Sequence, residues 1–327
     1  MFVIRSAIAA AIVSTAVAAM SVPACAADAV SLRLNWLLSG VHAIFYLGVD
    51  KGFYKENGIE LSIGEGQGSA RTVQVVATGS DTFGLVDGGS VIAGAARGAP
   101  VKAVLGIMNT SPYGISFRAD AGVTTIADAA GKSIAATAGE ATLALLPAVW
   151  KANNVDASKV RVLNVDGPGK LVAVLEKRTD GLLAGLEGQV IILDQKGLKQ
   201  KVFSLAELGV NTVGLTIVAS SKTIDGNPDL VKRFVRATIK SLEAAKADPA
   251  AAVAAALKAK PEADKALLAA QLAVSLTLVP SPSTPAAPTG EMAAADWART
   301  LDLMKTYQDV KTDLPAGTFF TNAFIAN

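Results

Sequence analysis

Polar residues that could bind a small molecule follow several predicted strands of this chain. In open α/β sheets, ligands bind where the carboxyl ends of strands meet the N-termini of helices, and free backbone N–H groups there attract anions or polar ring atoms. The candidates of this kind are Gly68, Ser69, Asp87, Ser90, Asn109, Ser111, Gly139, Glu140, Thr142 and Asp166. Their carboxylates could accept hydrogen bonds from ligand amines. Ordinary helix capping or structural hydrogen bonding is the alternative for each.

Trp36 and His42 are two further candidates, in the segment before the first predicted helix. A tryptophan buries about 150–250 Å² and prefers one polar partner. Trp36 could therefore pack in the core or offer a ring for stacking. His42 is the only histidine of the chain. A lone histidine at a helix start is usually a structural hydrogen bonder, and a ligand contact is the alternative.

Motifs of the common enzyme classes are missing from the sequence. The glycines at 64, 66 and 68 do not form G-x-G-x-x-G, and neither G-x4-G-K-[ST] nor G-x-S-x-G occurs. A Ser-His-Asp triad would have to use His42 without a recognisable nucleophile elbow. One histidine and one cysteine do not provide a zinc site. We therefore predict no enzymatic activity, no cofactor and no metal.

The elements that must position these residues follow an α/β pattern. Apolar residues alternate over 32–36, which predicts a strand, and then recur at helical spacing from 41 until Gly52. A strand over 59–63 opens into the glycine-rich turn 64–68, with Ser69 placed to cap the next helix. Strands are also predicted over 83–86, 101–108, 133–137, 160–165 and 181–185, each followed by a turn or helix start. This pattern indicates mostly parallel sheets flanked by helices.

The length of 327 residues suggests two domains at about 150 residues each. We expect a first lobe over 27–112, a second over 113–212, and a return to the first lobe over 213–327. Two crossings, near 110–116 and 211–216, would form a hinge. Helices predicted over 228–246, 250–259, 262–275 and 291–307 should buttress the first lobe. The proline-rich stretch 280–288 excludes regular structure.

Residues 1–26 are typical of a secretory signal peptide. Arg5 precedes an apolar run, and Ala24-Cys25-Ala26 fits an A-x-A cleavage site. Cys25 also fits a lipoprotein signal, but Pro23 stands where that signal has a small or aliphatic residue, so lipidation is the less favoured alternative. Cleavage would leave 301 residues without cysteine, which excludes disulfides and a cysteine nucleophile. The formal charge of +2 would fall to +1, too balanced to indicate binding to nucleic acid or an anionic membrane.

Three stretches resemble a known family. They are W-x5-H with FYLGVDKGFYKENGIEL over 36–61, GSDTFGLVD over 79–87 and ARGAPVK over 96–102. These are similar to the periplasmic substrate-binding proteins of ABC importers, and most similar to the branch that binds thiamine pyrimidine precursors, beside the nitrate, sulfonate and taurine binders. The likeness thins after about Ser116, although the order of elements agrees nearly to the end.

The resemblance implies a type II-like periplasmic-binding-protein fold, with the ligand cleft between two α/β lobes. It implies an exported, monomeric protein that closes on a small molecule and delivers it to a membrane permease. Trp36 would stack on a pyrimidine-like ring, while His42 and the polar strand ends would read its edge. Where those relatives carry Pro-Asn between the tryptophan and the histidine, this chain has Leu38-Ser39, which leaves the ligand open.

Three alternatives to pyrimidine transport remain. The ligand could be a small oxyanion, such as a sulfonate, taurine, nitrate or aromatic carboxylate, held by helix N-termini. No arginine is obviously placed as a bidentate clamp for one. The chain could instead be a secreted enzyme on the same fold, but nothing matches the cysteine-rich iron motif of eukaryotic relatives that make the pyrimidine. It could also be a sensor subunit that docks to a receptor.

Overall fold

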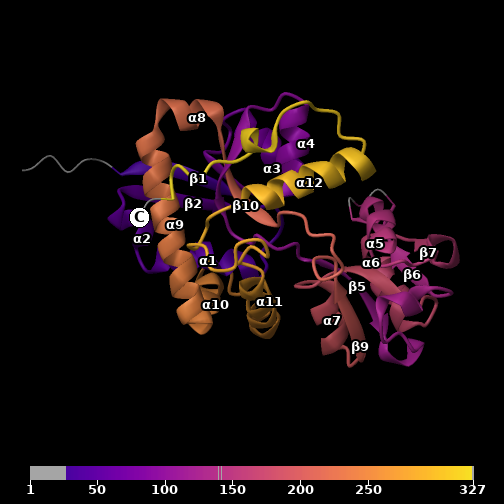
Figure 1. Cartoon of the computed structure of the whole chain (residues 1–327). Helices are drawn as coiled ribbons and strands as arrows, with labels where there is room; N and C mark the ends of the chain where they lie inside the picture. Colours follow the sequence, from indigo (N-terminus) through magenta and orange to yellow (C-terminus); the bar gives the residue numbers. More distant parts are fainter. Residues whose placement is uncertain (1–26, 139, 141, 326–327) are drawn as a thin grey trace, which may run out of the picture.

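The computed structural model describes residues 27–138, 140 and 142–325, which form two lobes, each built around one five-stranded sheet (Figure 1). The predicted signal peptide with Cys25, and the candidate Gly139, lie outside the described residues. No helix within the described part is long and apolar enough to cross a membrane.

The sheet of lobe 1 has the strand order β2-β1-β3-β10-β4. Its strands are β1 (Asp28–Arg33), β2 (Ile59–Gly64), β3 (Phe83–Asp87), β4 (Val101–Gly106) and β10 (Leu215–Ser220). β1 pairs in parallel with β2 and β3, whereas β10 is antiparallel to both β3 and β4. Four strands therefore run in one direction, and the strand that returns from lobe 2 runs against them.

The sheet of lobe 2 repeats this plan in the order β7-β6-β8-β5-β9. Its strands are β5 (Tyr113–Arg118), β6 (Ser133–Ala136), β7 (Arg161–Asn164), β8 (Gly181–Gly185) and β9 (Gln200–Ser204). β6 is parallel to β7 and β8, while β5, which follows the first crossing, is antiparallel to β8 and β9. Each sheet is thus mixed and mostly parallel, as predicted.

Short helices connect the strands of both sheets. In lobe 1 they are α1 (Ala43–Asp50), α2 (Phe53–Glu56), α3 (Ser69–Ala77) and α4 (Gly88–Ala96), with the 3-10 turn η1 (Gly40–His42) before α1. In lobe 2 they are α5 (Leu146–Ala152), α6 (Gly167–Leu175) and α7 (Gln189–Gln195), with the 3-10 turns η2 (Ala119–Ala121), η3 (Ile126–Ala129), η4 (Leu143–Leu145) and η5 (Ala157–Lys159).

The chain after β10 is mainly helical. It forms α8 (Ser221–Gly226), α9 (Pro228–Ala247), α10 (Pro249–Ala259), α11 (Lys265–Thr277), α12 (Ala294–Tyr307) and the 3-10 turn η6 (Ala316–Thr318). In α9, Val231, Phe234 and Val235 are fully buried and belong to the main core of lobe 1. The Phe234 ring stacks on Phe83 of β3 with 3.9 Å between the ring centroids. The predicted apolar stripe is therefore a core face.

Helix α12 contacts both lobes. Trp297, Leu301 and Met304 are buried in a lobe 1 core cluster, while Leu303 and Tyr307 pack against the core of lobe 2. Figure 1 shows this helix extending from lobe 1 toward α5. The C-terminal helices thus do not buttress lobe 1 alone, because α12 also bridges the lobes.

Several local predictions need correction. The first strand covers 28–33 rather than 32–36, because 28–33 pair in register with 59–64 and the chain leaves the sheet before Trp36. Gly68, not Ser69, precedes the first residue of α3, and the Ser69 hydroxyl instead accepts a hydrogen bond from the Asp87 N–H. Strands β5 and β9 and helix α8 were not predicted.

Candidate functional site

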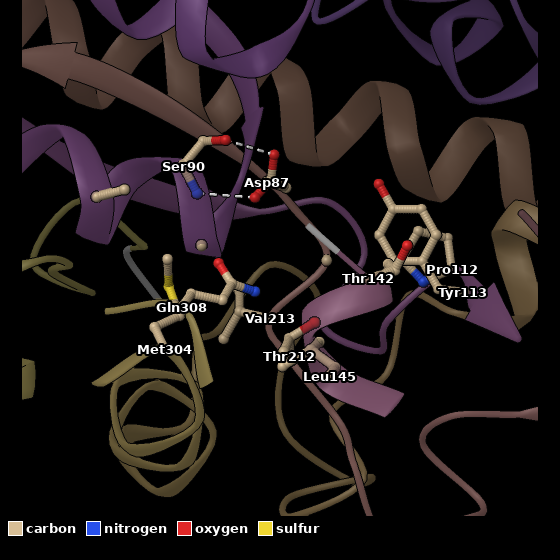
Figure 2. Close-up of a pocket in the computed structure, with 13 residues that line it drawn as sticks. Asp87, Ser90, Pro112, Tyr113, Thr142, Leu145, Thr212, Val213, Met304 and Gln308 are labelled. Atoms are coloured by element: carbon tan, nitrogen blue, oxygen red, sulfur yellow. Dashed lines mark hydrogen bonds between the residues drawn. The ribbon is translucent and has the colours of Figure 1, made fainter. Parts of the chain in front are cut away.

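A cavity of about 200 Å³ lies where the two lobes meet. We call it the interlobe cavity; its walls come from α4, both crossing segments, the start of lobe 2 and the end of α12. It is lined by Asp87, Gly89, Ser90, Ala93, Pro112, Tyr113, Thr142, Leu145, Thr212, Val213, Gly214, Met304 and Gln308. Figure 2 shows Asp87 and Ser90 on one side, with Tyr113 and Thr142 on the other. Residues from both lobes therefore surround the same space.

Asp87 caps α4 at the lobe 1 side of this cavity. Its carboxylate accepts hydrogen bonds from the Ser90 N–H at 2.8 Å and the Ser90 hydroxyl at 2.7 Å (Figure 2). Asp87 is thus the N-cap of α4. The Ser69 hydroxyl, beside Gly68, accepts from the Asp87 backbone N–H at 3.2 Å. These groups already form a connected hydrogen-bond network within lobe 1.

Tyr113, the first residue of β5, stands between the carboxylates of the two lobes. Burial raises the pKa of its phenol, and the negative charges of Asp87, Glu187 and Glu140 raise this pKa further. The phenol therefore stays protonated and keeps an O–H to donate. Three carboxylates, one from lobe 1 and two from lobe 2, act on this single side chain.

A second cavity of about 160 Å³ shares Tyr113 and Thr142 with the first. We call it the lobe 2 pocket; its lining is Tyr113, Glu140, Thr142, Lys170, Leu183, Ala184, Gly185, Glu187, Gly188 and Gln189. The buried Lys170 ammonium donates to Glu140 Oε2 at 2.7 Å and to the Leu183 carbonyl at 3.0 Å. Glu140 Oε1 accepts from the Thr137 N–H at 3.0 Å. The cation of this pocket is thus already paired.

Glu187 differs from the other carboxylates of the pocket. Its Oε2 atom is inaccessible to solvent and has no hydrogen-bond partner. Burial raises the pKa of Glu187 to about 7, and its own backbone N–H offsets only part of this effect. The adjacent Gly185 N–H donates to Gln189 Oε1 at 2.8 Å, so that donor is also in use. Glu187 is therefore a residue of the pocket lining whose covered Oε2 lacks a donor.

His42 is buried, and both ring nitrogens bond within lobe 1. Nδ1 accepts from the Ser39 N–H at 3.0 Å, so Nε2 carries the proton and donates to Asn35 Oδ1 at 2.8 Å. Burial lowers the pKa of His42 to about 3. Neither cavity is lined by it. These contacts are those of a structural hydrogen bonder, which is one of the two roles considered for His42.

Trp36 lies in the loop after β1, and 56% of its surface is exposed, which separates it from the core. The turn that follows β2 approaches this loop closely. The Gly66 N–H donates to the Trp36 carbonyl at 3.1 Å, and a Cβ at Gly66 would overlap the Leu34 carbonyl oxygen. The glycine-rich turn thus holds the Trp36 loop, and the indole remains accessible.

The remaining candidates do not line either cavity. Asn109 is buried and donates through Nδ2 to the carbonyls of Val279 and Glu291, which ties down the proline-rich segment. Ser111 is buried at the crossing between lobes, where its N–H donates to Asn211 Oδ1 at 2.8 Å and its hydroxyl has no partner. Asp166 is exposed and caps α6 by accepting from the Gly169 N–H at 2.7 Å.

The candidates that the structure brings together are therefore Asp87, Ser90, Glu140 and Thr142, with Ser69 bonded to Asp87. The sequence reasoning missed Tyr113, Lys170 and Glu187 as lining residues. Glu187 comes two residues after β8, so its strand-end position was a usable signal. Among the described residues, no group of three His, Cys, Asp or Glu side chains could hold a metal ion.

Two lobes joined by two crossings, with a cavity between them, define the periplasmic-binding-protein class. Within it, residues 39–252 match the family model described as "NMT1/THI5 like", and the chain belongs to this family. The periplasmic aliphatic sulphonate binding protein SsuA of Escherichia coli has the same fold, with a TM-score of 0.70 and 14% identity over 89% of this chain and 91% of that one.

Three curated relatives are similar over much of their length. The riboflavin-binding protein RibY of Chloroflexus aurantiacus is 25% identical over 90% of this chain and 86% of its own. The formylaminopyrimidine-binding protein of Halalkalibacterium halodurans is 20% identical over 91% of both chains. The 4-amino-5-hydroxymethyl-2-methylpyrimidine phosphate synthase of Aspergillus parasiticus is 24% identical over 69% of both.

Proposed function

We propose that this chain is the solute-binding component of an ABC importer, and that it captures a small nitrogen heterocycle of the pyrimidine type. One observation carries the choice of ligand: Tyr113 lines both cavities, the carboxylates of Asp87, Glu140 and Glu187 line one or the other, and Lys170 is already paired with Glu140. Such a cleft favours a neutral or cationic ligand with N–H donors. The names of two relatives, a riboflavin binder and a formylaminopyrimidine binder, agree with a ring ligand.

The mechanism is closure of the two lobes on the ligand. A ligand shifts this equilibrium only if it contacts the closed form better than the open one. Asp87 and Ser90 lie on lobe 1, and Tyr113, Thr142 and Glu187 lie on lobe 2, so a ligand between them would contact both. Trp36 lines neither cavity in this structure. We propose that closure brings its accessible ring onto the heterocycle. We assign His42, whose nitrogens are both engaged, to holding the Trp36 loop.

A small oxyanion is the less favoured ligand class. A sulfonate or nitrate needs cationic or N–H donors, and no arginine lines either cavity. Asp87 and Glu187 would repel it instead, because neither is paired with a cation in the described structure. The likeness to a sulphonate-binding protein at 14% identity concerns the fold alone.

Binding rather than catalysis is the role that the residues favour. One relative is named as a synthase, but this chain has a single cysteine, Cys25, and a single histidine, His42, which is buried and engaged. We further propose export to the periplasm by residues 1–26, delivery of the ligand to a membrane permease, and action as a monomer.

A thermal-shift panel on residues 27–327 tests this proposal. The panel contains 4-amino-2-methylpyrimidine, formylaminopyrimidine, riboflavin, taurine, ethanesulfonate, nitrate and benzoate. A ligand present at about 100 times its Kd adds about 2.7 kcal/mol to the free energy of unfolding. We expect an aminopyrimidine or riboflavin to raise the Tm and the anions to leave it unchanged. Stabilisation by sulfonates or nitrate alone would overturn the ligand class.

A further inference from the structure

We infer that Glu187 determines ligand specificity: its free carboxylate oxygen pairs with an amino group and the adjacent ring nitrogen of the heterocycle, and one proton is shared in the complex. This inference rests on the proposed function and deepens it. It selects amino-substituted rings over their oxo counterparts.

Glu187 carries an unsatisfied acceptor. A buried polar atom without a partner is unfavourable, so such an atom in a pocket lining is a candidate for a bond to a ligand. Glu187 Oε2 is such an atom, and it belongs to a residue that lines the lobe 2 pocket. Since Oε2 is covered in this structure, the carboxylate would turn toward the pocket to accept from a ligand N–H. The contact would be charge-assisted whenever the carboxylate or the ring carries the charge.

The other polar groups of the lobe 2 pocket are already engaged. Lys170 is committed to Glu140 Oε2 and the Leu183 carbonyl, and the Gly185 N–H is bound to Gln189. Burial raises the pKa of Glu187, and its own backbone N–H offsets only part of this effect. No cation of the described pocket lining is therefore left to pair with this carboxylate, so a ligand donor or a proton must do so.

A second unpartnered side chain, Thr137, follows the neighbouring strand, although it lines neither cavity. Thr137 follows β6, and its buried hydroxyl also has no partner. β6 and β8 are parallel neighbours, so Thr137 and Glu187 both follow carboxyl ends at the same edge of the lobe 2 sheet. Two unsatisfied side chains at one edge fit a flat ligand with several polar edge atoms.

The number of protons taken up or released on binding is a quantity that a merely structural role of Glu187 would not change. A complex between the carboxylate, a ring nitrogen and an amino group contains one shared proton. Burial raises the pKa of free Glu187 to about 7, so the free protein holds a proton there at pH 5.5 and lacks it at pH 8.5. The basic ring nitrogen of the free aminopyrimidine is also largely protonated at pH 5.5 and neutral at pH 8.5. Binding should therefore release up to one proton at pH 5.5 and take up as much as one proton at pH 8.5.

The test is calorimetric titration of residues 27–327 with 4-amino-2-methylpyrimidine in buffers of different ionisation enthalpy. Probes for comparison are its N,N-dimethylamino derivative and the corresponding oxo-pyrimidine. For Glu187→Gln we expect affinity for the aminopyrimidine to fall about 10- to 100-fold and proton uptake at pH 8.5 to disappear. Glu207→Gln, the same change at an exposed site of lobe 2, should alter neither.

The outcomes separate this inference from the proposed function. Wild-type binding of the aminopyrimidine with unchanged affinity and unchanged proton uptake in Glu187→Gln would overturn the role of Glu187 and leave the ligand class standing. Equal affinity of the wild type for the amino and oxo compounds would also overturn it. Binding of riboflavin but of no aminopyrimidine would overturn the inference alone, and failure of every heterocycle would overturn both.

Discussion

The two lobes share a strand plan but treat the polar residues at their strand ends differently. In lobe 1, Asp87 is satisfied by Ser90, and His42 by Ser39 and Asn35. In lobe 2, Thr137 Oγ1 and Glu187 Oε2 are buried without partners, after two neighbouring parallel strands. The side chains of Asp87 and His42 in lobe 1 are therefore satisfied before a ligand arrives, whereas Thr137 and Glu187 in lobe 2 keep hydrogen-bonding capacity.

This difference suggests a division of labour. Satisfied networks are rigid and position groups at fixed geometry, whereas an unsatisfied buried atom gains most from a new partner. We therefore expect lobe 1 to present a preformed surface and lobe 2 to bind the polar edge of the ligand.

The hydrophobic packing of the two lobes differs in the same way. Helices α9, α10 and α11 cover the core of lobe 1, while strand β7 leaves Val162 and Leu163 partly exposed at the edge of lobe 2.

The largest expected effect comes from removing a ring in the lobe 1 core. Phe234 is fully buried, stacks on Phe83 and contacts Tyr54. Phe234→Ala should lower the free energy of unfolding by about 3–5 kcal/mol, measured by urea denaturation. The matched control is Phe203→Ala in lobe 2, where the ring is only partly buried beside Phe117. We expect a smaller loss there, and equal losses would refute the contrast in packing.

The second prediction concerns the pH dependence of stability. Glu187 in lobe 2 and His42 in lobe 1 change the free energy of unfolding in opposite directions as the pH falls. Glu187 has its pKa raised to about 7, so the folded state binds its proton more tightly than the unfolded state. Its contribution to the free energy of unfolding is complete below about pH 4.5 and is lost as the pH rises through 7. A shift of this size corresponds to at most about 3 kcal/mol.

His42 has its pKa lowered to about 3, so between about pH 6.5 and 3 the unfolded state binds more protons. Its effect is to reduce stability as the pH falls. The two effects partly cancel between pH 4.5 and 6.5. We measure Tm as a function of pH. Relative to the wild type, the Tm of Glu187→Gln should increase as the pH rises above 5, and the Tm of His42→Gln should increase as the pH falls below 6. Parallel profiles for all three proteins would contradict both assignments.

The lesson for sequence analysis follows from the same residues. Many of the strand and helix positions, the caps Asp87 and Asp166, and the irregular 280–288 segment could be predicted because they depend on local pattern and turn chemistry. The satisfied or unsatisfied state of a polar side chain could not. Asn109 bonds to carbonyls 170 and 182 residues away, and burial of Lys170 depends on a pocket assembled from separate segments.

The third prediction compares the two helix caps, one in each lobe. Asp87 accepts from the Ser90 N–H and Asp166 from the Gly169 N–H at similar distances. Asp87→Ala and Asp166→Ala should each cost about 1 kcal/mol in unfolding free energy. Asp87 lines the interlobe cavity and Asp166 is exposed, so only Asp87→Ala should also weaken ligand binding. Weaker binding by Asp166→Ala would place the cleft elsewhere in lobe 2.

The smallest effect on stability is expected at Trp36. With 56% of its surface exposed, the side chain contributes little to the core, and Trp36→Ala should change the unfolding free energy by no more than about 0.5 kcal/mol. If lobe 1 offers a preformed surface, the same variant should weaken binding of an aromatic heterocycle by about 0.5–1.5 kcal/mol, measured by calorimetry. Trp36→Phe keeps a ring and should recover most of that affinity. A clear fall in Tm with unchanged affinity would assign Trp36 to packing, and stacking would then have to come from Tyr113 in lobe 2.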